Sequence, residues 1–147
     1  MENYMTIQKS KERIQKNGEV FTPRHLADKM LDKIDPIIWK DSSKTFCDPA
    51  AGDGNLIIAI LERRLSNGIS KEDSIKTLYA VELMQDNVTK MKQHIRDIIG
   101  SEFDYIIFKN IVCHDSLTWC FWGEFKKCSC KLCEIYKSKS NLSKFVK

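Results

Sequence analysis

The fold is decided by residues 46–56, which read Phe46-Cys47-Asp48-Pro49-Ala50-Ala51-Gly52-Asp53-Gly54-Asn55-Leu56. A short apolar run ends at an acid, and two close glycines follow before an aliphatic helix. Because Gly52 and Gly54 lack a Cβ, the backbone can turn sharply and a ligand can approach the amides that open the helix. Asp48 would lie at the carboxyl end of a strand, where open α/β sheets bind ligands. The stretch therefore predicts a nucleoside-binding turn.

Helical segments flank this turn on both sides. Ile57–Leu61 begins a strongly apolar helix that we expect to continue through Arg64, and Asn67-Gly68 can close it in a left-handed conformation. Upstream, Arg24–Ile34 has the pattern of an amphipathic helix whose apolar face contains Leu26, Met30, Leu31 and Ile34. The order strand, glycine turn, buried helix is typical of α/β proteins.

Two further strands are predicted, and each is followed by an acid. Thr77–Val81 ends at Glu82, and Ile111–Cys113 is followed by Asp115. A carboxylate only accepts hydrogen bonds, which suits Glu82 to bind both ribose hydroxyls and Asp115 to bind an adenine amine. Glu82 follows Gly52 at a longer interval than the roughly 20 residues of the dinucleotide fingerprint. The pattern therefore favours a related nucleoside site.

Each acid has a simpler alternative. Asp48, Glu82 and Asp115 can be solvated residues that cap a turn or a helix. For Asp115 taken alone this alternative is favoured, and for Glu82 the two interpretations are balanced. The two glycines after Asp48 favour ligand binding there.

Four segments resemble the S-adenosylmethionine-dependent DNA methyltransferases that modify the exocyclic amine of adenine. Residues 48–56 resemble the family's first cofactor motif, commonly Asp-Pro-Ala-small-Gly-x-Gly-x-hydrophobic. Residues 18–23 are similar to the motif that precedes it in the subgroup whose cofactor half comes first. Residues 79–84 resemble the ribose-binding segment, and residues 110–117 resemble the segment that contacts the cofactor adenine. The resemblance covers roughly residues 14–119.

This resemblance implies an α/β fold of the Rossmann-like class I methyltransferase type. We expect a three-layer sandwich with a mainly parallel, incomplete sheet, helices on both faces, and one cofactor pocket at the carboxyl ends of the strands. Residues 1–119 would form the S-adenosylmethionine-binding domain. Residues 120–147 would form a basic tail rich in cysteine and aromatic residues, which we expect to be weakly ordered.

The family's cofactor, S-adenosyl-L-methionine, would be bound by Phe21, Thr22, Pro23, Asp48, Ala50, Gly52, Gly54, Glu82, Leu83 and Asp115. By resemblance, Thr22 would reach the methionine carboxylate and the glycine turn would surround the methionine moiety. Glu82 would hold the ribose, Leu83 would pack against the adenine ring, and Asp115 would bind its amine. Alternatively, Thr22 is a helix N-cap with Pro23 at the first helical position, and Leu83 is part of the core.

One family motif is missing. The catalytic Asn/Asp-Pro-Pro-aromatic loop accepts hydrogen bonds from the target amine and stacks on the extruded base. No Pro-Pro pair is present, because the prolines are Pro23, Pro36 and Pro49. We therefore assign no catalytic residue, and we expect the cofactor half of a truncated or split DNA adenine-N6 methyltransferase of the restriction-modification type. Methyl transfer would need the missing catalytic half.

Two alternative functions remain open. The chain can be a non-catalytic remnant of a methyltransferase that binds DNA or another subunit. It can also belong to a methyltransferase for RNA, protein or a small molecule, because the cofactor fold does not choose the acceptor. The expected partners are DNA for the complete enzyme and a second methyltransferase subunit or a restriction subunit.

Composition agrees with a soluble globular protein. Hydrophobic residues make up 42% of the chain, and no apolar stretch approaches the roughly 18 residues of a membrane span. We find no apolar targeting core, and the six cysteines without a signal peptide favour reduced thiols. We expect a cytoplasmic protein with no membrane partner.

The positive charge is concentrated near the carboxyl terminus. Residues 121–147 contain seven Lys against Glu124 and Glu134, or +5, which leaves −1 of the total +4 for the first 120 residues. With its aromatic residues this segment can contact phosphates and bases, but a solvated end is the favoured interpretation. Cys128, Cys130 and Cys133 suggest a zinc site, but their irregular spacing favours incidental thiols, and no metal is assigned.

Overall fold

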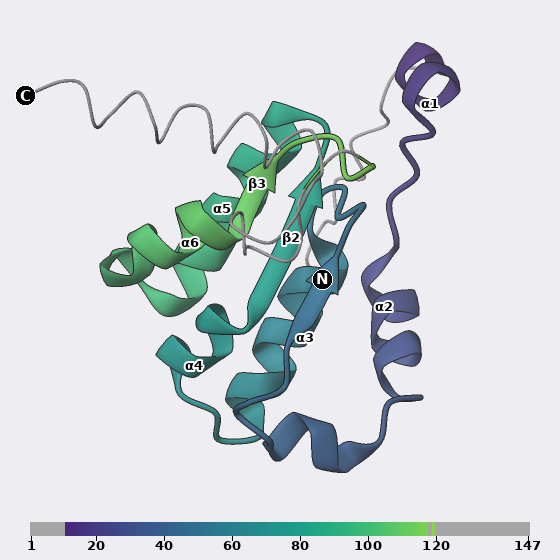
Figure 1. Cartoon of the computed structure of the whole chain (residues 1–147). Coiled ribbons are helices and arrows are strands. Elements are labelled where there is room, and N and C mark those ends of the chain that lie inside the picture. Colours follow the sequence, from purple (N-terminus) through teal and green to yellow (C-terminus); the bar gives the residue numbers. More distant parts are fainter. Residues whose placement is uncertain (1–10, 118, 120–147) are drawn as a thin grey trace, which may run out of the picture.

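The computed structural model describes residues 11–117 and residue 119, in which helices alternate with three strands. In chain order the elements are α1 (Lys11–Asn17), α2 (Arg24–Leu31), the 3-10 helix η1 (Pro36–Lys40), β1 (Phe46–Asp48), α3 (Asn55–Ser66), α4 (Lys71–Lys76), β2 (Leu78–Glu82), α5 (Gln85–Ile99), the 3-10 helix η2 (Ser101–Phe103), α6 (Asp104–Asn110) and β3 (Ile111–Cys113). Figure 1 shows this arrangement.

The three strands form one parallel sheet in the order β1-β2-β3. Ala80 at the centre of β2 lies opposite Asp48 on one side and Ile111 on the other. The carboxyl ends of the three strands therefore meet at one edge, and the residues that follow them are neighbours in space. This confirms the predicted α/β fold with an incomplete parallel sheet.

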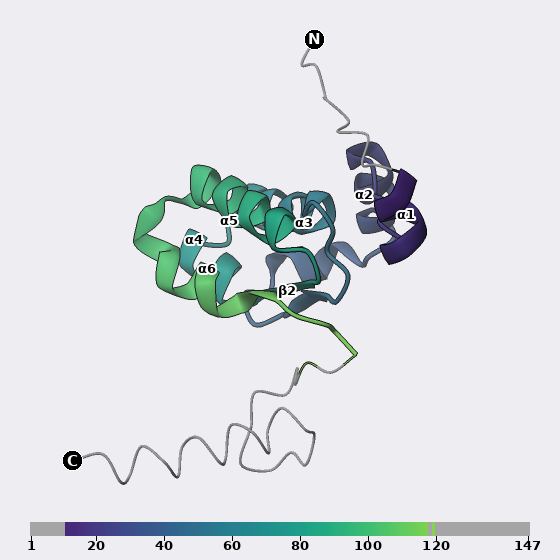
Figure 2. The ribbon, with the colours of Figure 1, turned by 90° about the horizontal axis from the view of Figure 1, so that it is seen from above.

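Helices α3 and α5 cover one face of the sheet. Figure 1 looks onto the opposite face with these helices behind the strands, and Figure 2 shows both on the same side of β2. Aliphatic side chains make this contact, and the fully buried ones include Leu78, Ala80 and Ile111 from the sheet and Ile57 and Ile95 from the helices. Among the described residues no helix covers the other face, so this part of the chain shows only one of the two expected helical layers (Figures 1 and 2). Apolar burial on this one face positions the strand ends.

A stack of aromatic rings and arginines fixes the amino end of β1. The rings of Trp39 and Phe46 are parallel within 8°, with centroids 5.2 Å apart. Arg63 lies over Trp39 at 5.2 Å and Arg64 over Phe46 at 5.1 Å. Arg64 is fully buried, and burial lowers its pKa. Its guanidinium donates to the carbonyls of Asp41 and Ser42 and to the hydroxyl of Thr77.

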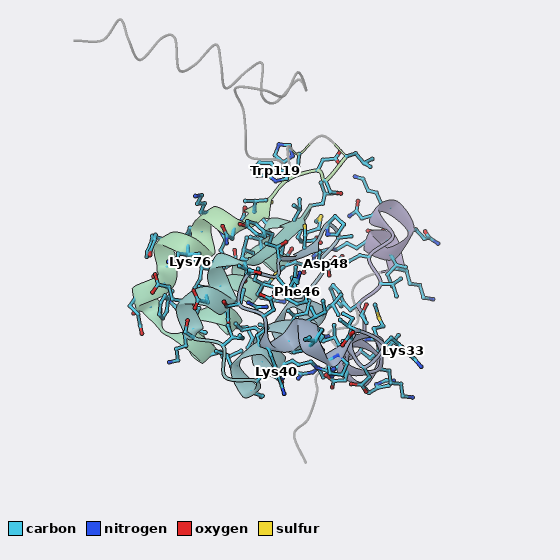
Figure 3. The ribbon with its side chains drawn as sticks, turned by 60° about the horizontal axis from the view of Figure 1, so that its bottom comes forward. Lys33, Lys40, Phe46, Asp48, Lys76 and Trp119 are labelled. Carbon is cyan, nitrogen blue, oxygen red and sulfur yellow. The ribbon has the colours of Figure 1, made fainter. Side chains whose placement is uncertain are left out.

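Several lysine side chains lie on the outside of the domain, in contrast to the buried Arg64. Figure 3 shows Lys33, Lys40 and Lys76 at its periphery, and all three are exposed. Among the residues that the structure describes, no helix has both the length and the apolar character to cross a membrane.

Helix α2 is shorter than expected, and its buried face is different. It ends at Leu31, and Ile34 follows in a turn. Ala27 and Leu31 are buried against α3, whereas Leu26 and Met30 are exposed. The prediction for Leu26 and Met30 was wrong because the helix turns its smallest side chain, Ala27, toward α3, which lets the two helices approach closely.

Two glycines with left-handed backbone bracket α3. Gly54, at the N-cap, has φ of 88°, and Gly68, beyond the other end, has φ of 84°. A Cβ on Gly54 would lie 2.6 Å from Cγ of Met91 in α5, whereas a Cβ on Gly68 would meet nothing within 4 Å. Both positions favour glycine because of their left-handed backbone, but only at Gly54 would a side chain also collide with a neighbour, Met91.

This difference predicts unequal effects of alanine. Gly54→Ala should lower the free energy of unfolding by about 2–5 kcal/mol, from left-handed strain of about 1–2 kcal/mol plus overpacking of about 1–3 kcal/mol. Gly68→Ala is the matched control and should lose only about 1–2 kcal/mol. Urea denaturation of both variants measures the difference. Equal losses would show that Met91 moves aside without penalty.

Candidate functional site

The edge of the sheet at which β1, β2 and β3 end, called the carboxyl edge here, contains the acids Asp48, Glu82 and Asp115. All three close the turn that follows them in the same way. Each carboxylate accepts a hydrogen bond from the backbone N–H two residues further along the chain, at 3.0 Å for Asp48, 2.9 Å for Glu82 and 2.9 Å for Asp115. The turn-capping interpretation therefore holds for one oxygen of each acid. A carboxylate has about four acceptor positions, so capping leaves acceptor capacity for a ligand.

Glu82 also connects the glycine turn to the sheet. Its Oε2 accepts a hydrogen bond from the Gly52 N–H at 2.9 Å, and its Oε1 accepts a longer one from Nδ2 of Asn87 at 3.3 Å. The Ala51 N–H donates to the Val81 carbonyl at 3.1 Å, which holds the turn beside the end of β2. Glu82 is only 8% exposed. The predicted turn and the predicted ribose-binding acid are therefore in direct contact.

Asp48 lies in an unfavourable position for a charged carboxylate. Its pKa is raised, mainly by burial and also by the nearby carboxylate of Glu82, while the hydrogen bond from Ala50 acts in the opposite direction. Two carboxylates thus face the same small region of the edge. A cationic group there would be stabilised by both.

The segment before α2 lies on top of the glycine turn. A Cβ on Gly52 would be 3.0 Å from Cδ1 of Phe21, so the ring lies against the bare glycine backbone. Asn55, the first residue of α3, donates from Nδ2 to the Thr22 carbonyl at 3.0 Å. Pro23 is the N-cap of α2, with no side-chain cap, so the interpretation of Thr22 as N-cap is wrong. Phe21 and Thr22 are instead part of the edge.

Polar contacts join α1 to the same edge. Arg13 forms ion pairs with Glu19 at 2.8 Å and with Asp86 in the first turn of α5 at 2.9 Å. The hydrogen bond to Asp86 is the main cause of a raised pKa for Arg13, which keeps the guanidinium charged. Asn17 donates to the sulfur of Met84 at 3.7 Å. None of the residues of α1 is buried, so polar contacts hold it.

Leu83 and Asp115 complete the edge. Leu83 is 55% exposed, so its interpretation as a core residue is wrong. The His114 N–H donates to the Glu82 carbonyl at 3.0 Å, which extends the strand pairing beyond β3 and brings Asp115 to this edge. Asp115 is exposed, and its carboxylate closes the turn at Leu117. It follows that Asp115 belongs to the edge but lies outside the tight contact of Glu82 with Gly52.

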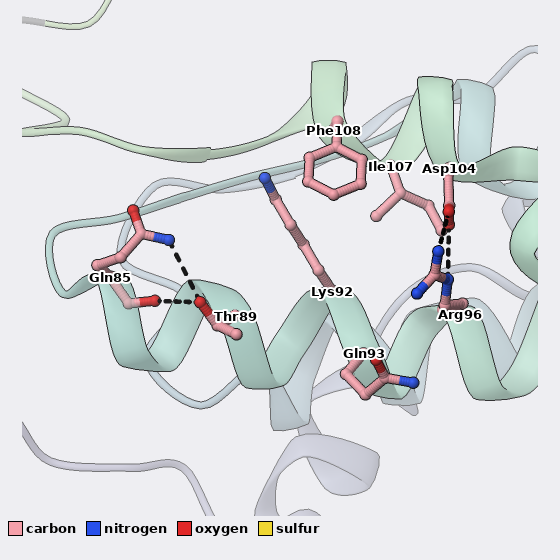
Figure 4. A pocket seen from close by; sticks show the side chains of 8 residues that line it. All are labelled: Gln85, Thr89, Lys92, Gln93, Arg96, Asp104, Ile107 and Phe108. Carbon is pink, nitrogen blue, oxygen red and sulfur yellow. Dashed lines mark hydrogen bonds and ion pairs between the residues drawn. The ribbon is translucent and has the colours of Figure 1, made fainter.

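A groove between α5 and α6 does not coincide with this edge. Its volume is about 160 Å³, below the roughly 300 Å³ of small ligand pockets. Its cations already have partners, since Lys92 lies 4.3 Å from the ring centroid of Phe108 and Arg96 pairs with Asp104. Burial lowers the pKa of Lys92. Figure 4 shows the lining residues Gln85, Thr89, Lys92, Gln93, Arg96, Asp104, Ile107 and Phe108. We therefore place the site at the edge.

Comparison with known families identifies the domain. A family model described as N-6 DNA Methylase matches residues 3–121 of the 147-residue chain. The chain belongs to the N-6 DNA methylase family. Comparison with curated proteins and with solved structures finds no significant match. The match confirms the predicted family, and N-6 DNA methylases act on DNA and generally use S-adenosylmethionine.

The edge has the chemistry that the cofactor of the N-6 DNA methylases requires. This cofactor presents a cationic sulfonium and ammonium, a carboxylate and two ribose hydroxyls. Asp48 and Glu82 are suitable acceptors, and Asp48 gains from a nearby cation. Helix α3 begins at a glycine without a capping side chain, and the N-terminus of a helix favours an anionic group. The residues present fit the cofactor.

Some predictions concern residues beyond the described range. The basic segment 121–147, which contains Cys128, Cys130 and Cys133, lies outside the described residues. Within the described residues, no group of three or more His, Cys, Asp and Glu side chains is placed to hold a metal ion.

The raised pKa of Asp48 predicts that Asp48→Asn stabilises the protein at pH 7. The amide can still accept from Ala50 but carries no buried charge. Because a raised pKa means that the folded state binds a proton more readily, wild-type stability rises as the pH falls through that pKa, which lies above the ordinary value of about 3.9.

Urea denaturation between about pH 7 and pH 4 tests this prediction. The advantage of Asp48→Asn should shrink as the pH falls. The control Asp97→Asn, on the exposed face of α5, should change stability by less than about 0.5 kcal/mol throughout. A pH-independent difference for Asp48→Asn would contradict the assignment.

Proposed function

We propose that this chain binds S-adenosyl-L-methionine at the carboxyl edge of its sheet, as the cofactor-binding part of a DNA adenine-N6 methyltransferase. The observation that carries the proposal is the 2.9 Å hydrogen bond between the Gly52 N–H and the Glu82 carboxylate. It joins the turn expected at the methionine end of the cofactor to the acid expected at the ribose. Phe21, lying against Gly52, adds the third segment.

Each residue has a role consistent with its surroundings. Glu82 would accept from a ribose hydroxyl with its remaining capacity, and exposed Leu83 would pack against the adenine ring. Asp48, whose pKa is raised by burial, would accept from the cationic end of the methionine moiety. Asp115 would bind the adenine amine, and Thr22, Ala50 and Gly54 would complete the methionine side. When bound, the cofactor supplies the methyl group.

The acceptor end of the reaction needs a motif that these 147 residues do not contain. An Asn/Asp-Pro-Pro-aromatic loop would hold the adenine amine in line with the methyl group by hydrogen bonding and stacking. We propose that residues outside this chain, such as a second methyltransferase subunit of a restriction-modification system, supply that loop. The free thiols of Cys47 and Cys113 suit a reducing compartment such as the cytoplasm.

The missing motif also supports a second candidate function. A methyltransferase-like domain without a catalytic loop can act as a binding module for DNA or for a subunit. The lysines and aromatic residues of segment 121–147 would then contact a phosphate backbone.

Calorimetric titration tests cofactor binding. The wild-type chain should bind S-adenosyl-L-methionine saturably, and Glu82→Gln should weaken binding about tenfold or more, because hydrogen bonds to charged groups contribute about 1.5–3 kcal/mol. Glu72→Gln removes an exposed carboxylate that pairs with Lys76 within α4, next to the amino end of β2, and should change affinity less than about twofold. Absence of binding by demonstrably folded protein would refute the proposal.

A methyl-transfer assay on unmethylated DNA separates the two candidate functions. The chain alone should transfer no methyl group, because its sequence lacks the Asn/Asp-Pro-Pro-aromatic loop that would position the target amine. Transfer by the purified chain would show that the missing motif is dispensable. Binding of DNA without binding of S-adenosyl-L-methionine would favour the binding module.

A further inference from the structure

One buried amide joins two carboxylates from distant parts of the chain. Asn87, in the first turn of α5, is 0% exposed. Its Nδ2 donates to Oε1 of Glu19 at 2.6 Å and to Oε1 of Glu82 at 3.3 Å. Glu19 lies before α2, and Glu82 ends β2. The two hydrogens of a single amide therefore hold these two acids.

Without the Asn87 amide, the carboxylates of Glu19 and Glu82 would lie close together with unfavourable repulsion between them. The Glu19 side chain is 5% exposed and Glu82 is 8% exposed. Two like charges at short distance and away from water disfavour each other. Arg13 offsets the charge of Glu19 from the outer side. Asn87 donates to both acids, so one amide holds both carboxylates in place.

Glu82 and Glu19 belong to the two segments that meet at the glycine turn. Glu82 holds the Gly52 N–H through Oε2. Glu19 is close in sequence to Phe21 and Thr22, which contact Gly52 and Asn55 respectively. A displacement of Glu19 would therefore move the segment that covers the glycine turn. A rotation of Glu82 would release the turn itself.

We propose that Asn87 is a positioning residue that couples residues 18–23 to Glu82, and so sets the methionine and ribose ends of the cofactor site together. The inference rests on the proposed function, because it concerns the same site. Asn87 does not bind the cofactor; it acts through the two carboxylates that it holds.

A second buried asparagine provides the matched control. Asn110, at the end of α6, is 6% exposed. Its Nδ2 also donates to two acceptors, the carbonyls of Ile75 at 2.9 Å and Lys76 at 3.3 Å. These acceptors are the last two residues of α4, next to the amino end of β2 and therefore at the opposite end of the sheet from the edge. We expect loss of this amide to affect stability but not the site.

The binding experiment compares Asn87→Ala with Asn110→Ala by calorimetric titration with S-adenosyl-L-methionine. Asn87→Ala should bind about tenfold more weakly than wild type, because loss of the donor misplaces charged acceptors. Asn110→Ala should bind within about twofold of wild type, although it too loses a buried donor. Equal affinities for Asn87→Ala and wild type, or equal losses in both variants, would overturn the inference.

A rescue variant adds a readout that general destabilisation would not produce. Asn87→Asp places a third carboxylate beside Glu19 and Glu82 and should bind more weakly than Asn87→Ala. Adding Glu19→Gln gives position 19 an amide that can donate to the new carboxylate at position 87. The double variant should therefore bind more tightly than Asn87→Asp alone. No recovery would count against the coupling.

Backbone amide chemical shifts, measured by NMR without cofactor, separate failure of this inference from failure of the proposed function. Asn87→Ala should shift the amide signals of Gly52 and of residues 19–22 together, and Asn110→Ala should leave both unchanged. If wild type binds no S-adenosyl-L-methionine, the proposed function fails and this pattern of shifts still decides the coupling. A change at only one of the two places would refute it.

Discussion

The hydrogen bond from the Gly52 amide to the Glu82 carboxylate is the interaction on which the functional edge depends. A backbone N–H bound to an ionised acceptor is among the stronger hydrogen bonds in proteins, especially where water is excluded. It holds the turn after β1 against the end of β2, and so determines where α3 begins. Phe21 then lies on the fixed glycine, and Asn87 holds Glu82 from the other side. Without this hydrogen bond, Phe21 would have no fixed glycine turn to pack against, and Asn87 would have no fixed carboxylate to donate to.

The two ends of the sheet are held by different physics. At the amino end, aromatic rings and the buried guanidinium of Arg64 form a stack. At the carboxyl end, Asp48, Glu82 and Glu19 bring three carboxylates together, and the pKa of Asp48 is raised mainly by burial and also by the charge of Glu82. An acid with a perturbed pKa, such as Asp48, is typical of binding sites.

The same acids serve both folding and the proposed binding. Asp48, Glu82 and Asp115 each close a turn with one oxygen, which aligns the chain where it leaves each strand. The remaining acceptor capacity is then presented at one edge without further ordering. The proposed cofactor site can therefore be formed before a ligand arrives, which reduces the entropy lost on binding.

The sequence by itself determined the glycine turn, the acids that follow the strands, and the strand Ile111–Cys113, because glycine backbone and apolar periodicity are local properties. The position of Glu82 beside Gly52 could also be anticipated, since parallel strands end at a common edge. Only the tertiary structure decided which face of α2 is buried and that Asn87 joins Glu19 to Glu82. Asn87 and Glu19 are 68 positions apart, and no periodicity marks either one. Such a pair is specified by the packing of α5 and the preceding segment against the sheet, which aligns donor and acceptor only after folding.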